Sequence, residues 1–129
     1  EPTLQLTDEV VAYFKALGYH QSIETNGTRR PPRGLDYITC SPKKEAMGLL
    51  QRNFPEGVGE FRFPVGADID LPPAVEDLPP AGAYLLSPIF VGETQQEVDK
   101  EAVELCVDYI LAHPEWQLSL QMHKLIHIP

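Results

Sequence analysis

The sequence predicts an α/β fold with a mostly parallel sheet. Short runs of strand-forming residues alternate with segments of helical periodicity along most of the 129 residues, and several runs end at a proline or a glycine turn. Parallel strands need a crossover segment between them, and an alternation of strands with helices supplies it. The chain shows no internal repeat, and its 43% of hydrophobic residues suffice for the core of one domain or of part of one.

The first helix is predicted from Asp8 to Leu17. Thr7 provides an N-cap oxygen, acidic residues fill the first turn, and Gly18 is placed as the C-terminal cap. Two strands follow, over Gln21 to Thr25 and over Leu35 to Thr39, because both segments are rich in β-branched or aromatic residues. The segment between them contains three arginines and two prolines, and it is predicted as a basic loop.

The middle of the chain carries a weaker helical pattern and one clear strand. Glu45 to Phe54 fits a short helix, limited by Gly48 and by the proline that follows it. Glu60 to Val65 alternates polar and apolar residues, the period of a half-buried strand. Asp68 to Gly82 holds four prolines and is predicted as an exposed connection with at most one helical turn.

The last third of the chain is predicted as strand, helix and strand. Ala83 to Ser87 is a continuous apolar run that suits a strand buried on both faces. Thr94 to Ala112 is predicted as the longest helix, because its apolar residues recur three or four positions apart opposite an acidic face. Trp116 to Met122 is predicted as the final strand.

The charge, hydropathy and cysteine content of the chain exclude several classes of function. The chain has 10 Lys and Arg against 19 Asp and Glu, a formal net charge of -9, which argues against nucleic acid as a partner. It holds no apolar run of the roughly 18 residues that a membrane span needs, and its start does not read as a signal peptide. Its two cysteines are too few for a disulfide scaffold or for an iron-sulfur cluster, which favours a reduced cytoplasmic compartment.

Polar groups follow several of the predicted strands. In parallel α/β sheets, ligands bind beyond the carboxyl ends of the strands, so these groups meet at one edge if the strands are neighbours. Each group also has a purely structural interpretation as a turn, a strand stop or a solvated side chain. The four strand ends are Glu24 to Thr28, Ser41 to Lys43, Ser87 with Pro88, and Gln121 to Lys124.

Other candidate residues have competing interpretations. Arg29, Arg30 and Arg33 can clamp a phosphate or a carboxylate, or form a solvated basic loop. The acidic residues of the long helix form an exposed face, since on a helix they do not converge on one metal ion. Cys106 is interpreted as core and Cys40 as a buried strand-end thiol.

Four runs of the sequence resemble a known family in their order and spacing. The family is the 7-carboxy-7-deazaguanine synthases, radical S-adenosylmethionine enzymes of the pathway to queuosine, and the resemblance is to their C-terminal part. Glu1-Pro2 looks like the end of the family's Gly-Gly-Glu-Pro motif. The four runs are Ile23 to Thr28, Tyr37 to Lys43, Leu86 to Ile89, and Leu118 to Lys124.

The resemblance implies that residues 1–129 are the C-terminal portion of a single radical S-adenosylmethionine domain, part of an incomplete TIM-like barrel. It implies conversion of 6-carboxy-5,6,7,8-tetrahydropterin to 7-carboxy-7-deazaguanine with loss of ammonia, by a protein that uses S-adenosylmethionine, a 4Fe-4S cluster and Mg²⁺ and forms a homodimer. It also implies two sets of site residues. The S-adenosylmethionine contacts are Ser41, Pro42, Lys43, Ser87, Pro88, Ile89 and Phe90, and the pterin contacts are Glu24, His123 and the terminal carboxylate of Pro129.

The sequence also departs from the family pattern. Ser87 stands where the family usually has Gln, and Phe90 stands where an acid can occur. The family's three-cysteine cluster motif is absent, and Cys40 and Cys106 cannot replace it, so we expect this chain alone to be inactive and to bind none of the cofactors. The alternative hypothesis is a non-catalytic α/β module that binds another ligand or a partner on the same scaffold.

Overall fold

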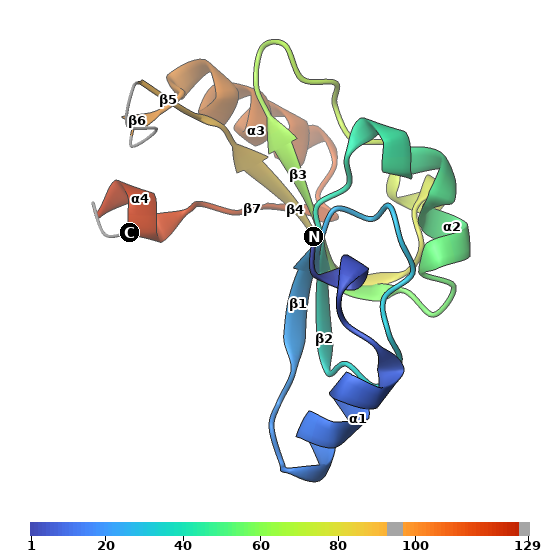
Figure 1. Ribbon diagram of the computed structural model, residues 1–129. Helices are drawn as coiled ribbons and strands as arrows, with labels where there is room; N and C mark the ends of the chain where they lie inside the picture. Colours follow the sequence, from blue (N-terminus) through green and yellow to red (C-terminus); the bar gives the residue numbers. More distant parts are fainter. Residues whose placement is uncertain (93–96, 127–129) are drawn as a thin grey trace. The chain divides into compact units, whose positions relative to one another are not determined.

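The computed structural model, which describes residues 1–92 and 97–126, is an α/β structure with a mostly parallel sheet (Figure 1). The pairs β1 with β2, β2 with β3, and β4 with β7 are all parallel, so the predicted fold class is confirmed at this level. Closure of the strands into part of a barrel stays a prediction. In hydrogen-bonding order, the five strands of the sheet are β1 (Ser22–Thr25), β2 (Tyr37–Cys40), β3 (Val58–Val65), β4 (Ala81–Pro88) and β7 (Trp116–Leu118).

The chain packs as two compact units. The first consists of Glu1–Phe61 and Ala74–Gly82, and the second consists of Arg62–Pro73 and Ala83–Pro129. Strands β3 and β4 each contribute residues to both units. The two units are therefore described one at a time.

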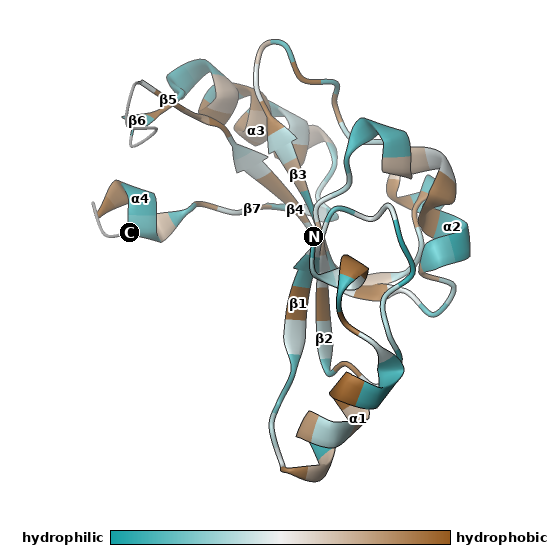
Figure 2. Cartoon of the chain, viewed as in Figure 1, coloured by the Kyte–Doolittle hydropathy of each residue, from teal (hydrophilic) through white to brown (hydrophobic). Residues whose placement is uncertain are grey.

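Helix α1 (Asp8–Ala16) opens the first unit after the short 3-10 helix η1 (Pro2–Leu4). The Thr7 hydroxyl accepts a hydrogen bond from the Val10 N–H at 3.3 Å, as the predicted N-cap requires. Leu17 is the C-cap, so the predicted helix is confirmed to within one residue. Both α1 and α3 show hydrophilic and hydrophobic residues in Figure 2, which is typical of helices with one buried side.

The segment after β2 forms two consecutive helices of different type. A 3-10 helix, η2 (Lys44–Leu49), leads into one α-helical turn, α2 (Leu50–Asn53). The prediction of a regular helix over Glu45 to Phe54 was therefore only partly right, because Gly48 disfavours the α conformation and Pro55 stops it. Leu50 and Phe54 are buried, and the Phe54 ring meets Phe61 edge to face at 6.4 Å.

The second unit is centred on Trp116. This residue is 1% exposed and begins β7, which pairs with β4 in the register Tyr84 with Trp116. The rings of Phe63, Tyr84 and Tyr109 lie 5.6, 5.6 and 6.1 Å from the Trp116 ring. Helix α3 (Lys100–Ala112) adds its buried residues, which are Ala102 and Cys106.

Two predicted boundaries in this unit were wrong. The long helix begins at Lys100, not at Thr94, because Asp99 is its N-cap: the Asp99 carboxylate accepts hydrogen bonds from the N–H groups of Glu101 and Ala102. Glu97–Val98 forms strand β6 instead, antiparallel to β5 (Phe90–Val91). The final strand ends at Leu118, where its partner strand β4 ends its pairing, and α4 (Met122–Leu125) follows.

The connection from Asp68 to Gly82 has no more than the one helical turn predicted, but it is not exposed throughout, because Leu78 and Pro79 are buried. It contains one short 3-10 helix, η3 (Val75–Asp77), and then joins β4 at Ala81. None of the helices in residues 1–92 and 97–126 is long and apolar enough to cross a membrane.

Candidate functional site

An open cavity of about 240 Å³, lined mainly by residues with polar side chains, lies in the first unit, where β1 and β2 end. The two strands are parallel and pair Thr25 with Cys40, so the segments that follow them leave the sheet at the same edge. The Ser41 N–H donates to the Thr25 carbonyl oxygen at 2.9 Å, which extends the pairing beyond the strand. The cavity is lined by Glu1, Pro2, Glu24, Thr25, Asn26, Ser41 and Lys43.

The Glu1 carboxylate is the most constrained group of this cavity. Its Oε1 accepts hydrogen bonds from the Thr25 hydroxyl at 2.8 Å, from the Thr3 N–H at 3.1 Å and from the Thr3 hydroxyl. Its Oε2 accepts a hydrogen bond from the Asn26 N–H at 2.7 Å. Burial raises the pKa of Glu1, but these hydrogen bonds outweigh burial and hold the pKa below its ordinary value of 4.5. The cavity therefore contains a fixed negative charge at neutral pH.

Hydrogen bonds at Asn26 and at Gly27 hold the turn beside the cavity. The Asn26 side-chain oxygen accepts hydrogen bonds from the N–H and the hydroxyl of Thr28, at 3.0 and 2.7 Å. Gly27 has a φ of +81°, and its carbonyl oxygen accepts a hydrogen bond of 2.9 Å from the buried Asn53 amide. A backbone held this way keeps the Asn26 N–H directed at Glu1.

A row of polar residues crosses the first three strands. Glu24 pairs with Thr39, and Thr39 pairs with Glu60, so the three residues lie on the same face of the sheet. The Thr39 hydroxyl donates to Glu60 Oε1 at 3.1 Å, and the Tyr37 hydroxyl donates to Glu60 Oε2 at 3.2 Å. Sequence reasoning did not identify Glu60 as a candidate, because only the register of the strands aligns it with Glu24.

The predicted second contact loop belongs to the second unit. Ser87 and Pro88 are buried at the end of β4, and Ile89 and Phe90 are half-buried. The Ile89 N–H donates to the Val65 carbonyl oxygen at 2.9 Å, and the Ile89 carbonyl oxygen accepts from the Asp99 N–H at 3.0 Å. The loop is therefore fixed by its backbone, which leaves the Phe90 side chain available for other contacts.

His123 and Lys124 lie on α4 in the same unit. His123 is exposed, and the Lys124 ammonium lies 5.0 Å from the centre of the Phe90 ring, a cation-π contact that joins α4 to β5. Pro129, predicted to contact the substrate, lies outside the described residues. The structure thus brings Glu24, Ser41 and Lys43 together, with the buried Pro42 between the last two. A common edge that these residues share with Ser87 and His123 stays a prediction.

The two cysteines do not fit the role of metal ligands. Both are 0% exposed. Burial and the Glu1 charge raise the pKa of the Cys40 thiol to about 12, and burial raises that of Cys106 to about 11. A 4Fe-4S cluster of this family's kind is held by three thiolates, whereas this chain has two cysteines, and both are closed off from solvent. Among the described residues, no three His, Cys, Asp or Glu side chains are placed to hold a metal ion.

The first unit is thus of the class of α/β structures in which parallel strands end at a cavity with charged and hydroxyl side chains around it. The chain is 36% identical over 129 residues to the 7-carboxy-7-deazaguanine synthase of Bacteroides thetaiotaomicron, covering 99% of this chain and 61% of that protein. It is also 36% identical over 135 residues to the synthase of Bordetella pertussis, covering 100% of this chain and 56% of that protein. No protein-family model matches the chain.

A third relative, the synthase of Nitratidesulfovibrio vulgaris, is 36% identical over 132 residues, again covering 100% of this chain and 56% of that protein. This chain is therefore related along its whole length to the 7-carboxy-7-deazaguanine synthases, and the resemblance seen in the strand-end motifs is confirmed. The chain spans little more than half the length of the curated relatives it matches.

Proposed function

We propose that the protein carrying this chain is a 7-carboxy-7-deazaguanine synthase. It converts 6-carboxy-5,6,7,8-tetrahydropterin to 7-carboxy-7-deazaguanine and ammonia by radical S-adenosylmethionine chemistry. The observation that carries the proposal is the cavity of Glu1, Ser41 and Lys43 at the ends of two parallel strands, in a chain whose relatives bear that enzyme name.

The cavity residues fit the methionine end of S-adenosylmethionine, which carries an ammonium and a carboxylate group. Glu1 is anionic, and its Oε2 accepts a single hydrogen bond among the described residues, so it has capacity to accept one from the ammonium. Lys43 is exposed at the rim and supplies a positive charge for the carboxylate, while the Ser41 hydroxyl can donate or accept. When bound, S-adenosylmethionine supplies the radical that starts the ring contraction.

We assign the pterin contacts to Glu24, His123 and Pro129. The Glu24 carboxylate lines the same cavity as Ser41 and Lys43, and carboxylates accept hydrogen bonds from guanidine-like ring edges of the kind a pterin presents. The exposed imidazole of His123 can both donate and accept. Ser87, Pro88, Ile89 and Phe90 form the second contact loop for S-adenosylmethionine in this proposal.

The 4Fe-4S cluster requires ligands other than Cys40 and Cys106, because two buried cysteines cannot supply its three thiolates. We propose that its thiolates come from a part of the protein outside these 129 residues, so the chain alone does not catalyse the reaction. The same holds for Mg²⁺, for which the described residues offer no cluster of ligands. We place the working enzyme, as a homodimer, in the cytoplasm.

The proposal is tested with the natural full-length protein after anaerobic reconstitution of its iron-sulfur cluster. The expected result is formation of 7-carboxy-7-deazaguanine, measured by liquid chromatography and mass spectrometry. The variant Lys43→Ala should lose most of this activity, whereas Lys100→Ala, an exposed lysine at the start of α3, should keep it. A reconstituted protein that binds S-adenosylmethionine but forms no product would favour the non-catalytic binding module instead.

A further inference from the structure

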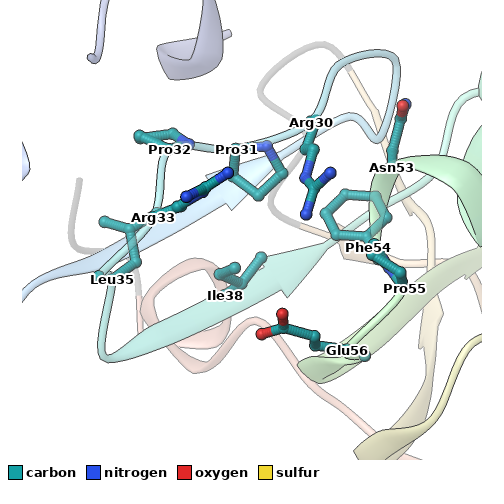
Figure 3. Close-up of a pocket in the computed structure, with 12 residues that line it drawn as sticks. Arg30, Pro31, Pro32, Arg33, Leu35, Ile38, Asn53, Phe54, Pro55 and Glu56 are labelled. Atoms are coloured by element: carbon teal, nitrogen blue, oxygen red, sulfur yellow. The ribbon is translucent and has the colours of Figure 1, made fainter. Parts of the chain in front are cut away.

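The first unit holds a second cavity, of about 370 Å³. The residues around it come from the loop that leads into β2, from Ile38 within β2, from the end of α2 and from the turn that leads into β3, whereas the Glu1 cavity lies where β1 and β2 end. The two cavities share no lining residue. Figure 3 shows the lining residues, which include Arg30, Pro31, Pro32, Arg33, Ile38 and Phe54.

Two arginines line this cavity from a loop whose backbone is hydrogen-bonded to α1 at Arg33 and Gly34. The Arg33 N–H donates to Asp8 Oδ1 at 2.9 Å, and the Lys15 ammonium donates to the Gly34 carbonyl oxygen at 3.0 Å. The guanidinium groups of Arg30 and Arg33 themselves have no hydrogen-bond or ion-pair partner in the described part of the chain. Two guanidinium groups without a protein partner among the described residues, on a loop held at Arg33 and Gly34, are an arrangement that can bind an anion.

The rest of the lining limits which anion fits. Leu35 and Ile38 are half-buried and Phe54 is buried, so one wall of the cavity is apolar. The charged residues of the lining are Arg30, Arg33 and Glu56, so the lining has a formal net charge of one positive unit. A single negative charge on an apolar body matches this composition better than a phosphate with two charges does.

We infer that this cavity, defined by Arg30, Arg33 and the apolar residues Leu35, Ile38 and Phe54, is a binding site for a small aromatic or branched organic carboxylate. The carboxylate lies between the two guanidinium groups and the apolar body lies against Ile38 and Phe54. The site is distinct from the proposed reaction site, since the two cavities share no lining residue.

The test uses benzoate as the probe and the natural full-length protein labelled with ¹³C in its isoleucine and leucine methyl groups. We expect benzoate to shift the methyl signals of Leu35 and Ile38 in a saturable way. The double variant Arg30→Ala with Arg33→Ala should weaken binding at least about tenfold, the loss expected for a charged hydrogen-bonded pair. Arg29→Ala is the matched control, because Arg29 belongs to the same loop but does not line the cavity, and it should leave the affinity unchanged.

Two further probes separate the charge from the apolar body. Benzyl alcohol should produce no saturable shift, and phenyl phosphate should bind no more tightly than benzoate. Absence of a saturable benzoate shift, or an equal loss in Arg29→Ala and in the double variant, would overturn the site. Tighter binding of phenyl phosphate would overturn its assignment to carboxylates.

Discussion

The Lys43 backbone N–H donates a hydrogen bond of 3.1 Å to the carbonyl oxygen of Asn26. This bond and the one from Ser41 to Thr25 attach the segment after β2 to the end of β1 and to the residue that follows it. The backbone, not the side chain, thus holds Lys43 at the cavity rim. Its ammonium group is left to the ligand, as a residue that recognises a carboxylate requires.

The first prediction is that Lys43→Ala leaves the fold unaffected. The substitution removes an exposed side chain and keeps the N–H that bonds Asn26, so the free energy of unfolding should change by less than about 0.5 kcal/mol. Urea denaturation followed by circular dichroism measures it. A loss of more than about 1 kcal/mol would show that the side chain has a structural role instead.

The second prediction concerns Gly27. A Cβ added there would lie 3.0 Å from Leu50 Cδ2 and 3.1 Å from Cys40 Sγ, at a φ of +81° that side chains rarely adopt. Gly27→Ala should therefore lower the free energy of unfolding by about 3 kcal/mol, from backbone strain and overpacking together. Gly18→Ala is the control, because Gly18 has a similar φ of +83° and open space around it, and it should lose about 1 kcal/mol. Equal losses in denaturation experiments would contradict the packing argument.

The third prediction is an acid dependence of stability that comes from Glu1. Because folding lowers the pKa of Glu1 below 4.5, its stabilising contribution is present above that pH and is lost as the pH falls through the folded-state pKa. The wild type should lose more stability than Glu1→Gln between about pH 6 and about pH 3. Denaturation at the two pH values measures this, with Glu104→Gln, an exposed helical position, as control. Parallel losses in wild type and Glu1→Gln would argue against the hydrogen bonds around Glu1.

The fourth prediction concerns the thiols. Folding raises the pKa of Cys40 from 9.0 to about 12. The free energy of unfolding that comes from keeping this thiol protonated is therefore complete below pH 9.0 and is lost as the pH rises toward 12. Both cysteines are buried and should not react with Ellman's reagent at neutral pH until the protein is unfolded in urea. A fast reaction in the native protein would show that a thiol is accessible.

The sequence predicted most of the first unit because its signals are local. The cap at Thr7 and the prolines and glycines between elements fix boundaries without reference to distant residues. The Glu1 cavity was predictable in part, because local signals mark where the strands end and, in a parallel sheet, the residues at those ends meet at one edge. Glu60 was missed, since its place beside Thr39 depends on strand register.

In the second unit, non-local pairing decided the boundaries. The pattern over Thr94 to Ala112 is helical by periodicity, but Glu97–Val98 pairs with Phe90–Val91. Similarly, the final strand stops at Leu118, where its pairing with β4 ends, although β4 itself continues to Pro88. Whether a short segment at the end of a sheet forms a strand depends on the strand beside it, and a single sequence does not show that pairing.

The most direct measurement of the central claim is the affinity of the natural full-length protein, with its cluster reconstituted, for S-adenosylmethionine. Isothermal titration calorimetry should show that Lys43→Ala weakens binding about tenfold or more, as expected from loss of a charge-assisted contact. Lys100→Ala should bind like the wild type. Equal affinities in the two variants would contradict the assignment of the Glu1, Ser41 and Lys43 cavity to this ligand.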